Sequence, residues 1–168
     1  MTPATRKLAL TVHVVTSVGW LGAVAAFLAL AVAGLTSSDP QRVRAVYLAM
    51  ELLGWFVIVP ASWASLLSGL IQSLGTEWGL FRHHWIVIKL VLNVLAGGVL
   101  LLHMGPIGEA ARAAAGPAPS IADLHGARVQ LVGDAIAALA VLAVATALSV
   151  IKPRGVTRYG ASQRARAR

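Results

Sequence analysis

Cysteine is absent from this chain, and charged residues are scarce. Without cysteine there is no disulfide, no thiolate nucleophile, no Cys-ligated zinc or iron–sulfur centre, and no C-x-x-C-H motif for covalent haem attachment. Charged residues make up 12% of the 168 residues, whereas about a quarter is usual in soluble domains. Because 58% of the residues are hydrophobic, the composition excludes a soluble core covered by a polar surface.

Four hydrophobic runs dominate the sequence, at residues 8–35, 45–74, 85–104 and 129–151. Each is long enough to cross a hydrocarbon layer of ~30 Å as a helix. Pro60 lies within the second run and predicts a kink there. The first run exceeds the roughly 7–15 apolar residues of a signal peptide, so we expect it to be retained. The sequence therefore predicts an all-α fold, an integral membrane up-down four-helix bundle formed by residues 1–151.

Positive charge is concentrated after the last hydrophobic run. Of the 14 Lys and Arg residues, six lie in residues 152–168, which contain no Asp or Glu. Because Lys and Arg accumulate on the cytoplasmic side, this distribution predicts an N-in/C-in orientation. We expect residues 152–168 to form a disordered basic cytoplasmic tail. We interpret this tail as a topology signal and not as a site for nucleic acid or anionic lipid, since Tyr159 is the one aromatic residue among the basic ones. The expected partner of the protein as a whole is the lipid bilayer, and no nucleic acid is expected.

Polar residues recur on one face of the third run. Their 4-3-4-3 spacing gathers Lys89, Asn93, Ala96, Leu100 and His103. Ionisable groups are costly in hydrocarbon, so we expect this face to point into the bundle and to have a functional role.

Depth along the helices divides the ionisable groups into two clusters. The predicted inner cluster contains His13, Lys89, His83 and His84. The predicted outer cluster contains Glu51, Asp134, His103, His125 and Arg128.

Haem b is one candidate ligand, because membrane cytochromes usually hold it through neutral imidazoles on helices that face one cavity. His13 is the best placed histidine within the membrane, and His103 is the second. His84 could approach a haem in the inner leaflet from the loop. The alternative for His13 is a hydrogen bond to a neighbour such as Gln72 or Ser68.

A metal site in the outer cluster is another candidate. His103, His125, Glu51 and Asp134 are acceptable ligands for zinc or Cu(II), although their spacing matches no specific motif.

A structural role is the third interpretation. The carboxylates then pair with arginines such as Arg128, and the protein is a cofactor-free assembly subunit.

Two stretches resemble known small four-helix membrane proteins. The first, HVVTSVGWLG from His13 to Gly22, resembles the opening of copper-resistance D-type proteins, HemJ-type protoporphyrinogen oxidases and a group of uncharacterised actinobacterial integral membrane proteins. The second runs from Ser68 through TEWGLF to WIVIKL, ending at Leu90, and is most similar to the last group. The resemblance covers roughly residues 8–103 and implies a multi-pass protein of the bacterial plasma membrane.

The HemJ-type resemblance also implies a cofactor site. Members of that family carry a histidine in the first helix, a lysine in a W-x-x-x-K-L motif of the third and a later histidine, and they are thought to bind haem b. The matching positions are His13, Lys89 and His103. The leading prediction is a redox or accessory membrane protein that holds one haem b through His13, alone, as a homo-oligomer or within a larger membrane complex. The alternatives are a HemJ-like porphyrinogen oxidase, a copper-handling protein and a cofactor-free assembly subunit.

Overall fold

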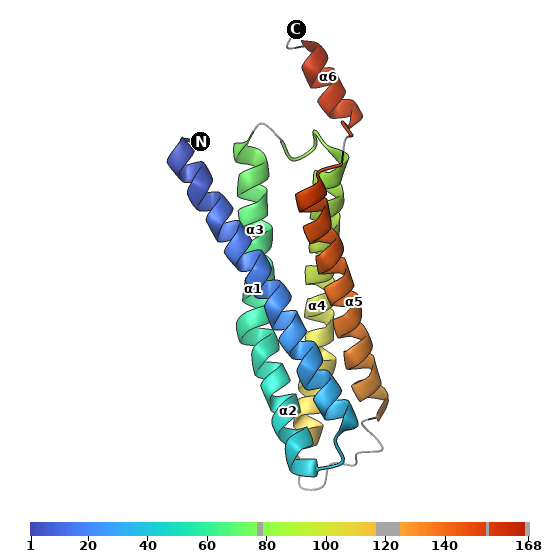
Figure 1. Ribbon diagram of the computed structural model, residues 1–168. Helices are drawn as coiled ribbons and strands as arrows, with labels where there is room; N and C mark the ends of the chain where they lie inside the picture. The colour runs from blue at the N-terminus through green and yellow to red at the C-terminus, as the bar shows by residue number, and fades with distance from the viewer. Residues whose placement is uncertain (77–78, 117–124, 154, 167–168) are drawn as a thin grey trace.

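The computed structural model describes residues 1–76, 79–116, 125–153 and 155–166. Its elements are α1 (Pro3–Thr36), α2 (Pro40–Leu53), the π-helix η1 (Gly54–Ile58), α3 (Val59–Gly75), α4 (His84–Ala115), α5 (His125–Ile151) and α6 (Arg158–Arg166). α2, η1 and α3 follow one another without a break, so they form one long helical rod. Figure 1 shows this rod, α1, α4 and α5 side by side in an elongated bundle, with α6 beyond one end.

The four rods are long and apolar enough to cross a membrane, which confirms the predicted four-helix membrane bundle. Both termini lie at the same end of the bundle, together with the connection from α3 to α4 (Figure 1). We call this the terminal end. The opposite end carries the α1–α2 turn, the end of α4 and the start of α5, and we call it the hairpin end. The arrangement agrees with an even number of crossings, while the orientation in the membrane stays a prediction.

Capping residues define the first two helix starts. Thr2 accepts a hydrogen bond from the backbone N–H of Thr5 at 3.3 Å, and Asp39 accepts one from that of Gln41 at 3.0 Å. A proline follows each cap, at a position where the helix has no need of its missing N–H. Both helices therefore begin several residues before their hydrophobic runs, which is why α1 and α2 start earlier than the predicted positions 8 and 45.

α4 is longer than the predicted span 85–104, because Gly105 and Pro106 do not end it. Beyond them, residues at helical spacing are buried, chiefly against α2: Ile107, Ala110, Ala111 and Ala114. Packing of this small-residue face outweighs the cost of one proline inside the helix. The length predicted from the sequence was too short, because a Gly-Pro pair usually marks a loop.

The π-helix η1 stands directly before Pro60. Proline cannot donate a backbone hydrogen bond, and its ring conflicts with the carbonyl four residues earlier. The structure accommodates it with one wide turn, in which the N–H of Val59 bonds to the carbonyl of Gly54. The predicted local distortion is thus present as a π-turn, a feature that is frequent at functional sites.

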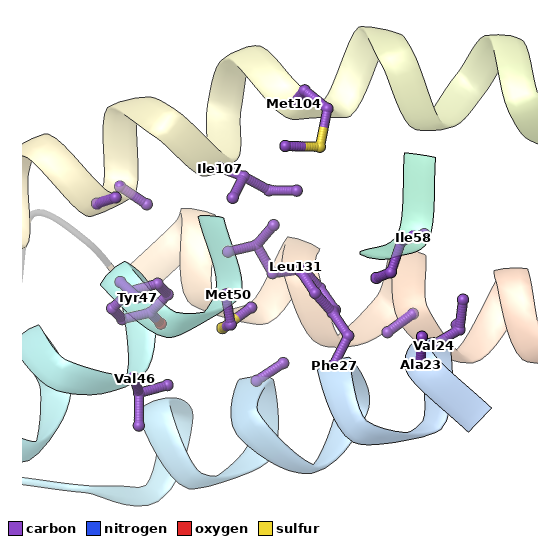
Figure 2. Packing of buried hydrophobic residues seen from close by; sticks show 14 of the residues in the cluster. Ala23, Val24, Phe27, Val46, Tyr47, Met50, Ile58, Met104, Ile107 and Leu131 are labelled. Atoms are coloured by element: carbon purple, nitrogen blue, oxygen red, sulfur yellow. The ribbon is translucent and has the colours of Figure 1, made fainter. Parts of the chain in front are cut away.

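The tightest packing lies in the hairpin half of the bundle. Val43, Tyr47 and Met50, all on α2, are the largest fully buried side chains of the described residues. Figure 2 shows Tyr47 and Met50 pointing from α2 towards the other helices. Gly34 allows α1 to approach α2 closely, since a Cβ there would lie 3.2 Å from the Tyr47 hydroxyl. Most side chains of α4 between residues 88 and 102 are exposed or half-buried, as expected for a lipid-facing helix.

Residues 155–166 of the predicted tail contain the nine-residue α6, and the residues before α6 contact the α3–α4 connection. The N–H of Thr157 donates to the carbonyl of Arg82 at 3.0 Å, and Val156 forms an antiparallel bridge with His83. Gly160 packs so closely on the Arg82 carbonyl that a Cβ would lie 2.5 Å from its oxygen. Backbone pairing, which charge patterning does not reveal, therefore orders this segment.

Candidate functional site

Two cavities lie along the predicted polar face of α4. The first, the terminal cavity, has a volume of about 390 Å³ and lies between α1, α3, α4 and the end of α5 in the terminal half. The second, the central cavity, has a volume of about 350 Å³ and lies deeper, towards the hairpin end. Lys89 and Asn93 line the terminal cavity, whereas Ala96, Leu100 and His103 line the central one. Two members of each predicted cluster line a cavity: His13 and Lys89 line the terminal one, and His103 and Asp134 line the central one.

His13 is held in the wall of the terminal cavity by α3. Its Nδ1 lies 3.1 Å from the carbonyl oxygen of Ser65 and 3.1 Å from the hydroxyl of Ser68. A carbonyl can only accept, so Nδ1 must carry the proton when this bond forms. The neutral ring then has its lone pair on Nε2. Such an Nδ1–H to carbonyl bond is the usual way in which proteins orient a ligating histidine.

A polar seam between α1 and α3 fixes the position of His13. The hydroxyls of Ser17 and Ser65 lie 2.8 Å apart, and the side-chain amide of Gln72 donates to the carbonyl of Ala9 at 2.9 Å. Small polar residues at helical spacing allow two membrane helices to approach and bond in this way. Gly69 completes the seam, because a Cβ there would lie 3.1 Å from Cε1 of the His13 ring.

Cationic side chains surround the rest of the terminal cavity. Lys89 lines it from α4, with its Nζ 5.9 Å from the ring centroid of Trp85. Arg6 and Lys152 contribute from α1 and from the residue after α5. None of the described residues that line this cavity is acidic. The cavity is therefore positively charged at its terminal side, which favours an anionic ligand.

The central cavity has a different character. Its described wall is apolar except for the indole of Trp20, His103 and Asp134. His103 Nε2 lies 3.0 Å from Asp134 Oδ2, and His103 Nδ1 lies 2.8 Å from the carbonyl oxygen of Val99. The Nε2–Oδ2 contact has the distance of an ion pair but not the alignment of a hydrogen bond.

The structure brings together two of the four predicted cofactor residues. His13 and Lys89 share the terminal cavity, as the depth argument predicted. His103 belongs to the central cavity instead, because it follows Lys89 by almost four helical turns. His84 is exposed at the start of α4, beside Gly155 of the tail, and the described wall of the terminal cavity does not include it.

The predicted four-residue metal site is not gathered in one place. Asp134 contacts His103, whereas Glu51 lies beside Gly108 and His125 is exposed at the start of α5. The described residues contain no group of three or more His, Asp or Glu side chains that could hold a metal ion. Met104, beside His103 in the sequence, is buried in the core against Gly54.

Arg128 has a role that the sequence did not indicate. It was expected to pair with a carboxylate of the outer cluster, but its guanidinium donates to the backbone carbonyls of Gly34 and Ser37 at the end of α1. The side chain is 3% exposed. Carbonyls in the last turn of a helix lack partners within the helix, and a cation is favourable there. Arg128, on α5, thus caps the C-terminal end of α1.

Comparisons with protein-family models, with curated proteins and with solved structures found no match to this chain.

Proposed function

We propose that the terminal cavity binds haem b, that His13 would hold its iron, and that the protein is a redox or accessory protein of the bacterial plasma membrane. The observation that carries the proposal is the bond from His13 Nδ1 to the Ser65 carbonyl within a cavity that Lys89 also lines. The bacterial location is supported by the sequence resemblance, and the membrane location by the four apolar rods.

The residues present suit this cofactor in three respects. The neutral His13 ring offers the Nε2 lone pair, which is the donor that haem iron takes from a proximal histidine. Arg6 and Lys89 would pair with the two propionates of haem. The volume of about 390 Å³ lies in the range of cofactor pockets. When bound, haem b would supply one-electron chemistry to the protein.

Histidine occurs once in the described wall of the terminal cavity. The proposal is therefore ligation by a single histidine. The apolar part of the wall, which includes Leu10, Leu66 and Ile86, would exclude water from the bound group. Arg6 and Lys89 would hold its anionic groups.

An absorption spectrum of the full chain, purified in detergent after expression with haem supply, tests the proposal. We expect a Soret band that His13→Ala removes and His103→Ala retains, since His103 belongs to the other cavity. Lys89→Met should keep the band but weaken haem retention during purification. A featureless wild-type spectrum would exclude haem, and a Soret band that survives in His13→Ala would exclude His13 as the ligand.

A further inference from the structure

The central cavity has an apolar wall, one polar pair and an opening to lipid. Leu95 and Val99, which line it from α4, are 59% and 50% exposed. A ligand can therefore enter from the bilayer without crossing the polar ends of the bundle. We propose that this cavity binds a lipophilic quinol, whose ring hydroxyl donates a hydrogen bond to Asp134.

The contacts of His103 define how many protons the pair holds. Its Nδ1 faces the Val99 carbonyl, which can only accept, so Nδ1 carries a proton. Nε2 and the Asp134 Oδ2 atom are 3.0 Å apart, a distance at which two lone pairs repel each other. A further proton on either of these two atoms relieves that repulsion. The pair is neutral as a whole in either form, which explains how a carboxylate is tolerated in an apolar wall.

The remaining oxygen of Asp134 determines the ligand chemistry. Oδ2 is buried, whereas the side chain as a whole is 36% exposed, so we infer that Oδ1 is the oxygen that a ligand can reach. Oδ1 is a carboxylate oxygen in one form of the pair and a carbonyl oxygen in the other, and it accepts a hydrogen bond in both. The ligand must therefore offer a donor. A hydroxyl meets this requirement, whereas the oxidised quinone, which has carbonyl oxygens only, does not.

Two further features of the wall favour a ring over a simple chain. Trp20 and Phe27 line the cavity from α1, and aromatic side chains pack well on a flat ring. Gly54 and Ile58 line it from η1. The wide turn before Pro60 therefore forms part of this wall, and π-turns are frequent where a ligand binds. The apolar remainder suits a hydrocarbon tail.

Equilibrium binding of radiolabelled decylubiquinol to the full chain in lipid nanodiscs, kept anaerobic, tests the proposal. We expect saturable binding that is at least about tenfold weaker for the dimethyl ether of the same compound, which has lost the donors. We expect dodecanol, which has a hydroxyl and a chain but no ring, to compete only weakly with the quinol. Competition as strong as that of the quinol itself would show that the ring is not recognised and would contradict the proposal. Equal binding of quinol and dimethyl ether, or no saturable binding, would overturn the proposal without any variant.

Variants locate the site. Asp134→Leu should weaken quinol binding by about tenfold or more, and Ala138→Phe should block it by filling the cavity. His13→Ala and Lys89→Met belong to the terminal cavity and should leave quinol binding unchanged. Conversely, Asp134→Leu should leave the Soret band unchanged, so the two proposals fail separately. Unaltered quinol affinity in both Asp134→Leu and Ala138→Phe would place the ligand elsewhere and refute the assignment.

Discussion

The Nδ1 atom of His13 lies 3.1 Å from the carbonyl oxygen of Ser65, and Gly69, one turn further along α3, lies against the same imidazole. The Ser65 carbonyl thus holds the ring on one side, and Gly69 leaves the space that the ring needs on the other. A backbone carbonyl cannot be removed by substitution, but a side chain added at Gly69 can alter the orientation of His13.

Gly69→Ala should disturb the haem site without removing its ligand. The new Cβ would lie 3.1 Å from His13 Cε1, so the ring must rotate or shift by a few tenths of an ångström. Changes to groups that orient a ligand typically cost 10–100-fold in affinity, and we expect about tenfold weaker haem binding with a shifted Soret maximum. Gly97→Ala is the matched control, because a Cβ at Gly97 meets nothing within 4 Å. Identical spectra for the two variants would refute this account of His13.

Arg128→Met should lower the free energy of unfolding by about 1.5–3 kcal/mol. The substitution has two opposite effects on the free energy of unfolding. It removes a buried charge, which stabilises the fold, but it leaves the carbonyls of Gly34 and Ser37 without their donor, which destabilises it. We expect the second to be larger, because the Arg128 side chain is 3% exposed and water has little access to the site that the guanidinium leaves. SDS-induced unfolding in mixed micelles measures the difference. Arg42→Met, at an exposed position of α2, serves as control and should change stability by less than about 0.5 kcal/mol.

The four apolar rods and the polar face of α4 could be predicted from the sequence, because hydropathy and helical spacing are local properties. The grouping of His13 with Lys89 also followed, since depth in a bundle is proportional to residue number. Both inferences needed only the assumption that the helices are straight and antiparallel.

The roles of Arg128 and Ser65 could not be predicted, because they depend on which carbonyls of another helix lie nearby. Every residue carries a carbonyl, so no sequence pattern distinguishes those of Gly34, Ser37 and Ser65. The same reason explains the tail, where the partner of Thr157 is the backbone of Arg82. A pair of side chains can be suggested by the two residue types in the sequence, whereas a contact to the backbone requires only one particular residue type and so cannot be recognised.

Gly160→Ala should release α6 from the α3–α4 connection while strengthening the helix itself. A Cβ at Gly160 would lie 2.5 Å from the Arg82 carbonyl oxygen, and backbone on both sides cannot yield as a flexible side chain does. Alanine is favoured over glycine within a helix by about 1 kcal/mol, so the helical signal of the segment should persist. Amide hydrogen exchange at Thr157, whose N–H bonds to Arg82, should accelerate by about tenfold or more. Gly126→Ala, in an open position at the start of α5, should leave that amide unaffected; equally slow exchange in both variants would contradict the docked tail.

The orientation in the membrane can be read directly, because the natural chain contains no cysteine that would react with a thiol probe. Ser38, in the α1–α2 turn, and Ser162, on α6, are exposed at opposite ends of the bundle. With both termini cytoplasmic, a membrane-impermeant maleimide added to intact cells should label Ser38→Cys and not Ser162→Cys. After permeabilisation both variants should react, which establishes that each thiol is accessible. The physical basis is the excess of Lys and Arg at the terminal end, which resists transfer across the membrane. Labelling of Ser162→Cys alone in intact cells would show that the orientation is the reverse of the predicted one. The cationic side of the terminal cavity would then face the outside of the cell.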